Sequence, residues 1–364
     1  MSKQIYAIAI LAGSIIGAGI FSLPYTVSKS GTLPMLFYLL FLGLLAMLIH
    51  LMVAEIALKS PDNKRLPGFA KMYLGKKGEK AAFFSNIFGI IGTILAYLII
   101  GGEFLSNILN IDPFYATLIY FALGAILIIF GIKIISKVEF YGVILFFVFL
   151  ILIFLKSINF IDISNLNIAF NPEYLFLPYG PVLFSLWGIS IVPEAEELLL
   201  KERKDLKKIV IASFIICFIV YAFFTALVLS VCGTGVSEES LNCLQSIIGG
   251  DIGFALMAFG ILTTFTSFIT IGLTLQKILW FDLGLKKNTS TIITCGVPIT
   301  LFLLGINSFL GVISFVGGLL FAIDGILILL IYGRINRKIK VLTYPLFLLF
   351  VLGMLYEIIT FFNK

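Results

Sequence analysis

Glycine and proline interrupt an apolar stretch near the N-terminus, which reads GSIIGAGIFSLPY (13–25). Gly costs about 1 kcal/mol and Pro about 3 kcal/mol in a helix interior, so we expect the helix to unwind at Gly17, Ala18 and Gly19. Unwinding frees backbone N–H groups, and the half-helix that follows points its positive end at the gap, which suits a carboxylate. The freed carbonyls from Gly13 to Ile16 would accept a cation. Alternatively, the small residues only allow close helix packing, because Gly13 and Gly17 have GxxxG spacing.

A second apolar stretch is interrupted in the same way and reads PYGPVLFSLWGISIVPEAEE (178–197). In lipid, irregular backbone is tolerated only where it lines a cavity or is buried in protein. The carbonyls of Ser185, Trp187 and Gly188 could accept an ammonium group. Phe184 and Trp187 could cover the ligand as an aromatic gate, or could simply face lipid and neighbouring helices. Together the two breaks predict a site for a zwitterion such as an amino acid.

Four hydroxyl residues lie within five positions of an otherwise apolar stretch. They are Thr263, Thr264, Thr266 and Ser267. Their hydroxyls could bind Na+ together with the carbonyls of the first broken helix. The alternative is that each hydroxyl bonds back to the carbonyl four residues earlier in its own helix.

Three further polar side chains lie inside apolar stretches. Glu103 and Asp324 have no basic residue in the same stretch, and intramembrane acids are functional candidates by default. Either could take up and release a coupling proton. Tyr97 could donate its hydroxyl to a substrate carboxylate or be a packed aromatic. The only histidine, His50, is expected to be structural.

These residues need membrane helices to position them. The chain is 60% hydrophobic and 12% charged, and its mean hydropathy is +1.14, whereas soluble domains are about 25% charged. A membrane-spanning helix needs about 20 apolar residues. We therefore predict an all-α membrane protein with about eleven spans: 5–28, 34–57, 82–109, 113–132, 138–157, 178–200, 208–232, 252–280, 290–305, 308–332 and 341–362.

The basic residues support this arrangement. With the N-terminus in the cytoplasm, most of the 25 Lys and Arg residues fall on the inner side, as the positive-inside rule requires. The C-terminus would then lie outside the cell membrane. Because the basic residues lie between spans rather than on folded polar surface, the net charge of +6 does not indicate a nucleic-acid partner; the expected partners are membrane lipid and a small molecule.

The four cysteines are scattered and have no metal-ligand spacing, so no bound metal or other cofactor is expected besides a coupling ion. Only Cys232 and Cys243 could lie in one outer loop. A disulfide there is possible, but we expect two unpaired thiols.

The two broken helices are five spans apart and therefore cross the membrane in opposite directions. This is typical of an inverted repeat whose site lies at the repeat interface. We predict one transporter domain over 1–364, with a first repeat in 1–157, a second in 178–333 and an additional helix at 341–362.

The stretch GAGIFSLPY (17–25) resembles the amino acid–polyamine–organocation superfamily. Four more stretches fit its amino acid/auxin permease and aromatic amino acid permease branches: AEIALKSP (54–61), LPGFAKMYLG (66–75), AYLIIGGEFLSNIL (96–109) and LFSLWGISIVPEAEELL (183–199). The resemblance implies the LeuT-type 5+5 inverted-repeat fold, with helices 1 and 6 discontinuous, and transport by alternating access.

The resemblance also implies roles for individual positions. The amides of Gly17 to Gly19 would take the substrate carboxylate, and Phe184 would form the outer gate. The substrate amine would bind the carbonyls of Ile15, Ile16, Phe184 and Trp187. A sodium-like site would combine the carbonyls of Gly13 and Ile16 with the hydroxyls of the eighth helix.

Two departures from the family pattern matter. Many members have an acid two positions after the glycine of helix 6, where this chain has Ser190, which argues against a polyamine or cationic substrate. Some proton-coupled members have a lysine in the middle of helix 5, and residues 140–155 contain none.

The sequence therefore predicts a secondary active transporter, an H+- or Na+-coupled symporter of neutral amino acids, aromatic or branched-chain. The alternatives are a membrane amino acid sensor without turnover and an amino acid or amine exchanger. An enzyme is not expected, because the chain shows one histidine and no nucleophile–base pair. The sequence leaves the oligomeric state open.

Overall fold

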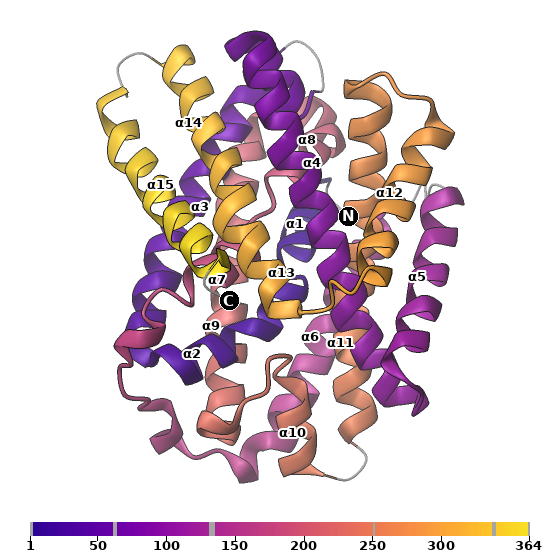
Figure 1. Ribbon diagram of the computed structural model, residues 1–364, viewed down its shortest axis with the longest axis vertical. Coiled ribbons are helices and arrows are strands. Elements are labelled where there is room, and N and C mark those ends of the chain that lie inside the picture. The colour runs from indigo at the N-terminus through magenta and orange to yellow at the C-terminus, as the bar shows by residue number, and fades with distance from the viewer. Residues whose placement is uncertain (1–2, 61–63, 131–134, 250–251, 337–339, 363–364) are drawn as a thin grey trace.

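The computed structural model describes residues 3–60, 64–130, 135–249, 252–336 and 340–362, and within them every regular element is a helix (Figure 1). The first half contains α1 (Lys3–Ile15), η1 (Ala18–Ser22), α2 (Leu23–Ser30), α3 (Thr32–Lys59), α4 (Leu66–Leu109), α5 (Pro113–Phe130) and α6 (Ile135–Ser157). Three short helices, η2 (Ile158–Phe160), η3 (Ile163–Leu166) and η4 (Pro172–Tyr174), lie in the connection to the second half.

The second half begins with α7 (Tyr179–Ser185), η5 (Ile189–Ile191), α8 (Val192–Leu199), η6 (Leu200–Asp205), α9 (Leu206–Cys232), η7 (Gly233–Gly235) and α10 (Leu241–Ile248). It continues with α11 (Ile252–Lys277), η8 (Ile278–Asp282), α12 (Lys287–Leu303), α13 (Phe309–Phe315), η9 (Val316–Phe321), α14 (Ala322–Ile335) and α15 (Lys340–Phe362).

Seven helical stretches in the described residues are long and apolar enough to cross a membrane, and the pair formed by α1 and the η1–α2 segment, bent by 42°, makes an eighth. The remaining predicted spans correspond to the broken pair α7 and α8, to the shorter α12 and to α15. The helix count thus agrees with the predicted membrane bundle. The helix that contains the predicted span 82–109 starts earlier than expected, at Leu66. Two helical segments join across Gly75, whose φ of 74° lies in the left-handed region that favours glycine.

Both predicted helix breaks are present. Regular α-helix ends at Ile15 in the first segment and at Ser185 in the second, and short tight helices resume after Gly17 and Gly188. The sequence locates these breaks well because glycine and proline act on the backbone locally.

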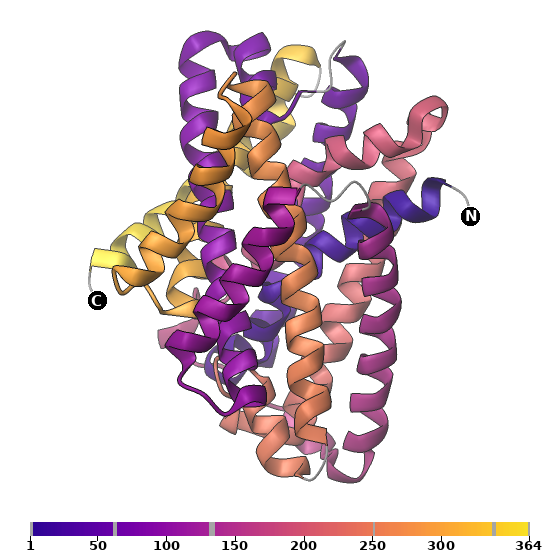
Figure 2. The same ribbon diagram turned by 90° about the vertical axis from the view of Figure 1, so that its right-hand side faces the viewer.

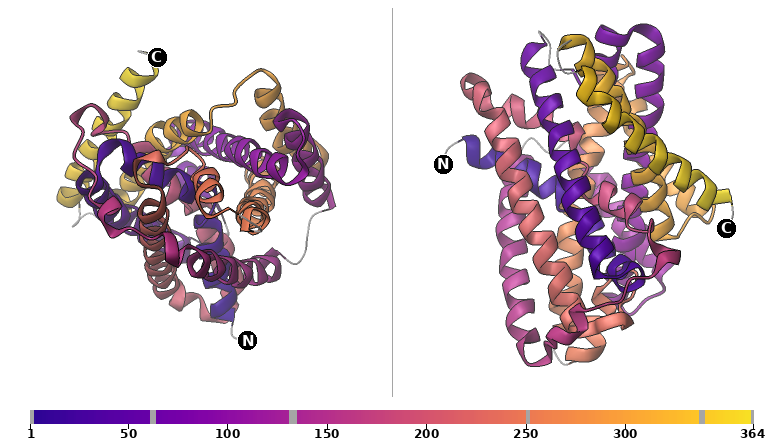
Figure 3. Two further views of the ribbon diagram at one scale, coloured as in Figure 1. Left: turned by 90° about the horizontal axis from the view of Figure 1, so that it is seen from below. Right: turned by 90° about the vertical axis from the view of Figure 1, so that its left-hand side faces the viewer.

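The broken helices lie at the centre of the bundle. Helix α1 packs between α6, α9 and α8, whereas α7 packs against η9, α13 and α3. The long α4 and α11 pack against each other beside them. Figure 2 shows the outer ends of α1 and α15 on opposite sides of the bundle, and Figure 3 shows the same bundle from below and from its other side.

The expectation of two unpaired thiols is wrong. Cys232 at the end of α9 forms a disulfide with Cys243 in α10, and their Cα atoms are 6.2 Å apart. The reason is tertiary: α10 turns back and packs on α9, which brings the two sulfur atoms together. Of the other two cysteines, Cys217 is buried and Cys295 is partly exposed, and neither is paired.

Candidate functional site

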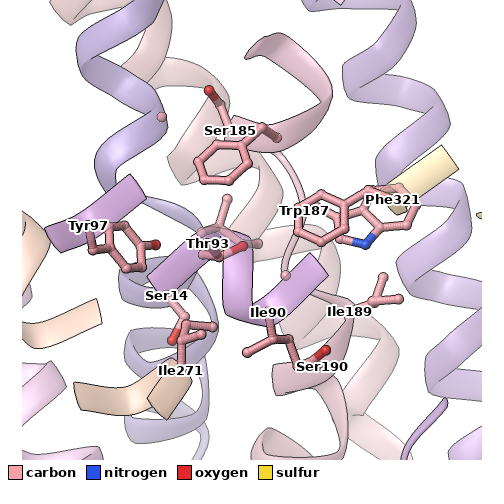
Figure 4. A pocket seen from close by; sticks show the side chains of 14 residues that line it. Ser14, Ile90, Thr93, Tyr97, Ser185, Trp187, Ile189, Ser190, Ile271 and Phe321 are labelled. Atoms are coloured by element: carbon pink, nitrogen blue, oxygen red, sulfur yellow. The ribbon is translucent and has the colours of Figure 1, made fainter. Parts of the chain in front are cut away.

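A cavity lies between the two helix breaks (Figure 4). Its lining residues are Ser14, Ile15, Gly19, Ile90, Thr93, Tyr97, Phe184, Ser185, Trp187, Gly188, Ile189, Ser190, Ile271 and Phe321. Seven of these are predicted substrate-binding residues: Ile15, Gly19, Tyr97, Phe184, Ser185, Trp187 and Gly188. The cavity volume is about 20 Å³, which holds little more than one water molecule, so an amino acid enters only if the helices move apart.

The glycines of the first break allow very close contacts. A Cβ atom on Gly17 would lie 2.2 Å from the hydroxyl oxygen of Tyr97, and one on Gly19 would lie 2.4 Å from Oγ of Ser185. Both distances are shorter than any van der Waals contact, so the close packing proposed as the alternative role of these glycines is real. The same packing aims the Tyr97 hydroxyl at the unwound segment and toward the cavity (Figure 4).

The hydroxyl of Tyr221 in α9 contacts the backbone of both broken helices, and this residue was not predicted from the sequence. Its hydroxyl oxygen lies 2.6 Å from the carbonyl oxygen of Ile15 and 2.6 Å from that of Ser185. A phenol has one proton to donate and each carbonyl has two acceptor sites. The Ile15 carbonyl also accepts the N–H of Gly17 at 2.8 Å, which uses its second acceptor site. The Ser185 carbonyl keeps an acceptor site for the ammonium group that it was predicted to bind.

His50, which we expected to be structural, makes hydrogen bonds through both of its ring nitrogens. Its Nδ1 lies 2.7 Å from the carbonyl oxygen of Ala46, and its Nε2 accepts a hydrogen bond from the N–H of Gly188 at 2.9 Å. This pairing requires the neutral tautomer with the proton on Nδ1. A fully buried side chain of α3 thus satisfies a backbone donor that the second break leaves free.

One wall of the cavity is aromatic. The ring of Phe321, from η9, stacks on Trp187 with 5.5 Å between centroids and 13° between planes, and on Phe184 at 6.0 Å and 17°. Figure 4 shows Trp187 and Phe321 stacked on one side of the cavity, opposite Tyr97. Phe321 was not predicted, because no sequence feature separates it from the other 36 phenylalanines of this chain.

Two polar atoms in the cavity lining have no hydrogen-bond partner among the described residues. They are Oγ of Ser14 and Nε1 of Trp187, and both side chains are buried. Buried polar groups are nearly always paired. The unpaired Ser14 hydroxyl, which can donate and accept, and the unpaired Trp187 N–H, which can donate, therefore indicate a place for a polar ligand.

The hydroxyls of α11 follow the back-bonding alternative. Thr263, Thr264 and Thr266 each donate to the carbonyl four residues earlier, at 2.8–3.1 Å. Ser267 bonds to the Thr263 carbonyl and also reaches α1, where its hydroxyl lies 3.2 Å from the carbonyl oxygen of Gly13.

The predicted components of the ion site nevertheless meet at one place. A second small cavity of about 10 Å³ is lined by Gly13, Ile16, Thr263 and Thr266, and also by Glu139 of α6. Glu139 was not predicted, because the family pattern drew attention only to a lysine within residues 140–155. The available signal was that Glu139 is the one acid within the predicted span 138–157.

The two predicted intramembrane acids have different surroundings. Asp324 is fully buried and accepts hydrogen bonds from the Ser85 hydroxyl and, at 2.9 Å, from Nδ2 of Asn86. The same Asn86 nitrogen lies 3.3 Å from Oγ of Ser190 in the cavity lining, so Asp324 is linked to the cavity. Glu103 lies partly exposed further along α4 and lines neither small cavity.

A charged cluster joins the second broken helix to two long helices. Arg65 and Lys277 both pair with Glu194 of α8, and each also lies within 4 Å of Glu197. Arg65 immediately precedes α4 and Lys277 ends α11, and Arg65 is only 3% exposed. The cluster therefore ties α8, the second half of the broken helix, to α4 and α11 at one end of the bundle.

Comparisons with known proteins agree with this architecture. Residues 1–344 match the tryptophan/tyrosine permease family. The tyrosine-specific transport system 1 of Haemophilus influenzae is 24% identical over 297 residues, which cover 76% of this chain and 73% of that protein. A solved structure of Mhp1, a nucleobase-cation-symport-1 family transporter in a closed conformation with bromovinylhydantoin bound, superposes with a TM-score of 0.64. The match has 13% identity over 89% of this chain and 77% of that chain.

The likeness to Mhp1 confirms the predicted LeuT-type fold. The family match confirms the resemblance to amino acid permeases, and specifically to the aromatic branch. It also agrees with the expectation that the chain is a transporter and not an enzyme. Because the match spans nearly the whole sequence, this chain belongs to the tryptophan/tyrosine permease family.

Proposed function

We propose that this protein is a cation-coupled secondary transporter that carries neutral aromatic amino acids across the cell membrane, with its N-terminus in the cytoplasm. The observation that carries this proposal is the composition of the central cavity. It combines the backbone of two broken helices with the stacked aromatic wall of Phe184, Phe321 and Trp187. Aromatic rings prefer such offset or stacked neighbours at 4.5–7 Å.

Each part of an aromatic amino acid has a counterpart in the site. The amide of Gly19 at the first break and the Tyr97 hydroxyl suit the carboxylate, and the Ser185 carbonyl suits the amine. The aromatic wall suits the ring. Ser190 offers no charge to a cationic side chain, and the tyrosine transport system among the relatives supports the same substrate class.

Transport requires the site to change volume. A cavity of about 20 Å³ cannot contain a tyrosine, so substrate must bind a more open state and be released from another. The charged cluster at Glu194 is suited to hold one end of the pathway closed, because it joins a broken helix to α4 and α11. Such an arrangement is that of a transporter with alternating access.

The proposal is tested with purified protein reconstituted in liposomes. Uptake of labelled tyrosine, tryptophan, phenylalanine and leucine is measured under an inward H+ gradient, an inward Na+ gradient and no gradient. We expect accumulation of the aromatic substrates under at least one gradient and little for leucine. Substrate binding detected by thermal shift without flux under any gradient would instead identify a sensor. Uptake that occurs only when the liposomes are preloaded with substrate would identify an exchanger.

A further inference from the structure

Glu139 lies in the membrane-embedded part of the bundle, where α6 packs against α1 and α11. Its side chain is 1% exposed. Oε1 accepts a hydrogen bond from the Thr270 hydroxyl of α11. Oε2 is packed against α1, since a Cβ atom built on Gly13 would lie 2.7 Å from it. The carboxyl group therefore touches the first broken helix directly.

No cation neutralises this carboxyl group among the side chains that the structure describes. The titratable groups that face this region from the packed helices are the Tyr97 phenol of α4, which interacts electrostatically with Glu139, and the Tyr6 phenol of α1, whose ring lies 5.3 Å from that of the neighbouring Phe140. The facing side chains of α11 are the hydroxyls of Thr263, Thr266 and Thr270. A lone buried carboxylate is strongly unfavourable in a membrane span unless a positive charge joins it.

The space beside Glu139 fits such a charge. The cavity of about 10 Å³ is bounded by Glu139, by Gly13 and Ile16 of the first break, and by Thr263 and Thr266. It lies at the C-terminal end of α1, which ends at Ile15. The C-terminal end of a helix carries partial negative charge and stabilises a cation. The carboxylate, the helix end and the two threonine hydroxyls thus favour the same sign of charge, although Val143, Phe146 and Leu262 make the rest of the lining apolar.

Asp324 is the weaker candidate for this role. Both of its oxygens accept hydrogen bonds, from Ser85 and Asn86, and such full pairing stabilises the ionised form without any added cation. Oε1 of Glu139 accepts a hydrogen bond from Thr270, whereas its other oxygen lies against the backbone of α1.

We infer that Glu139 binds the coupling cation, a single positive charge in the form of a proton on the carboxylate or Na+ in the adjacent cavity. This inference rests on the proposed cation-coupled transport. When Glu139 is negative, it repels the C-terminal end of α1; when the cation is bound, α1 packs stably on α6. Because Gly13 is four residues before Gly17, this change acts directly on the unwound amides that would hold the substrate carboxylate.

The test compares Glu139→Gln, Glu139→Asp and the control Glu173→Gln in liposomes; Glu173 is exposed in η4, in the connection between the two halves. Two assays are run: gradient-driven accumulation of labelled tyrosine, and counterflow, in which external label exchanges with internal tyrosine without a gradient. We expect Glu139→Gln to retain counterflow but to lose accumulation by about tenfold or more, the usual range of a coupling between two sites. Glu139→Asp keeps the charge and should keep part of the accumulation, and Glu173→Gln should resemble the original protein.

Thermal unfolding separates the two forms of the cation. Without substrate, the original protein is titrated with Na+ against choline at fixed pH, and with pH in the absence of Na+. A stabilisation by Na+ that Glu139→Gln loses identifies Na+, and a pH dependence lost in the same variant identifies a proton. The inference is overturned if Glu139→Gln accumulates tyrosine as well as the original protein, or if its response to Na+ and pH is unchanged.

The same design distinguishes this inference from the proposed function. If the original protein shows neither counterflow nor accumulation, the transport proposal fails. If it transports but Glu139→Gln is indistinguishable from it, only the role of Glu139 fails. Should Glu139→Gln not be recovered folded, Glu139→Asp decides by itself: its cation concentration for half-maximal accumulation must shift, and an unchanged value contradicts the inference.

Discussion

The Nε2 atom of His50 accepts a hydrogen bond from the backbone N–H of Gly188 at 2.9 Å. A side chain in one continuous helix thereby satisfies the backbone of a broken one. The contact joins residues 138 positions apart, and it is made at the edge of the central cavity, where Gly188 is part of the lining.

Replacing His50 by Ala should destabilise the protein by about 1–3 kcal/mol, the cost of leaving a buried donor unpaired. His50→Gln is the matched variant, since its amide oxygen can accept from Gly188 and should restore part of the loss. Thermal unfolding in detergent measures both. Equal stability of His50→Ala and the original protein would show that the Gly188 N–H finds another partner.

Gly17→Ala should abolish high-affinity substrate binding, because the added Cβ would lie 2.2 Å from the Tyr97 hydroxyl oxygen. Overpacking of this kind costs about 1–3 kcal/mol. The double variant Gly17→Ala/Tyr97→Phe removes the clashing oxygen and should recover folding stability, though without the hydroxyl that we place at the substrate carboxylate. Binding is followed by tyrosine-dependent thermal shift; no recovery in the double variant would contradict this geometry.

Phe321→Leu should weaken binding of aromatic substrates by about 0.5–1.5 kcal/mol, the value of an aromatic pair beyond its buried area. The reason is that Phe321 stacks on both Trp187 and Phe184. Phe302→Leu is the control, since Phe302 stacks on Phe114 away from the cavity. Inhibition of tyrosine uptake by phenylalanine, compared with inhibition by leucine, measures the selectivity for aromatic substrates. This selectivity should fall in Phe321→Leu and stay constant in Phe302→Leu.

Arg65→Ala should open the end of the bundle that the charged cluster closes. Removing one partner of a buried ion pair typically costs about 3–5 kcal/mol because the other charge is left unpaired. Alkylation of a cysteine placed by Ser190→Cys, in a background lacking Cys217 and Cys295, should be faster when Arg65 is replaced.

The control for this experiment is Lys71→Ala, since the pair between Lys71 and Glu79 spans the kink at Gly75 and involves neither broken helix. Arg65→Lys, which keeps a positive charge facing Glu194, should alkylate more slowly than Arg65→Ala. Unchanged alkylation in Arg65→Ala would show that the cluster does not control access to the cavity.

Much of the fold follows from the sequence because its signals are local. A break at Gly17 or Gly188 depends on backbone propensity within one turn, and a span depends on the apolar content of about 20 neighbouring residues. Because these signals are local, the sequence did not predict contacts that depend on the path of a whole helix. Cys232 and Cys243 are 11 residues apart, yet their pairing depended on the path of α10, which no local pattern encodes.

The sequence by itself determined the membrane location, the broken helices and a site between them. The tertiary structure decided which side chains complete that site: Tyr221 across both breaks, Phe321 on the aromatic wall, and Glu139 against Gly13. The physical reason is that backbone propensity and hydropathy are properties of short segments, whereas these contacts join residues of different helices that lie 36 to 206 positions apart in the sequence. Only the packing of the whole bundle brings such residues within hydrogen-bond or van der Waals distance.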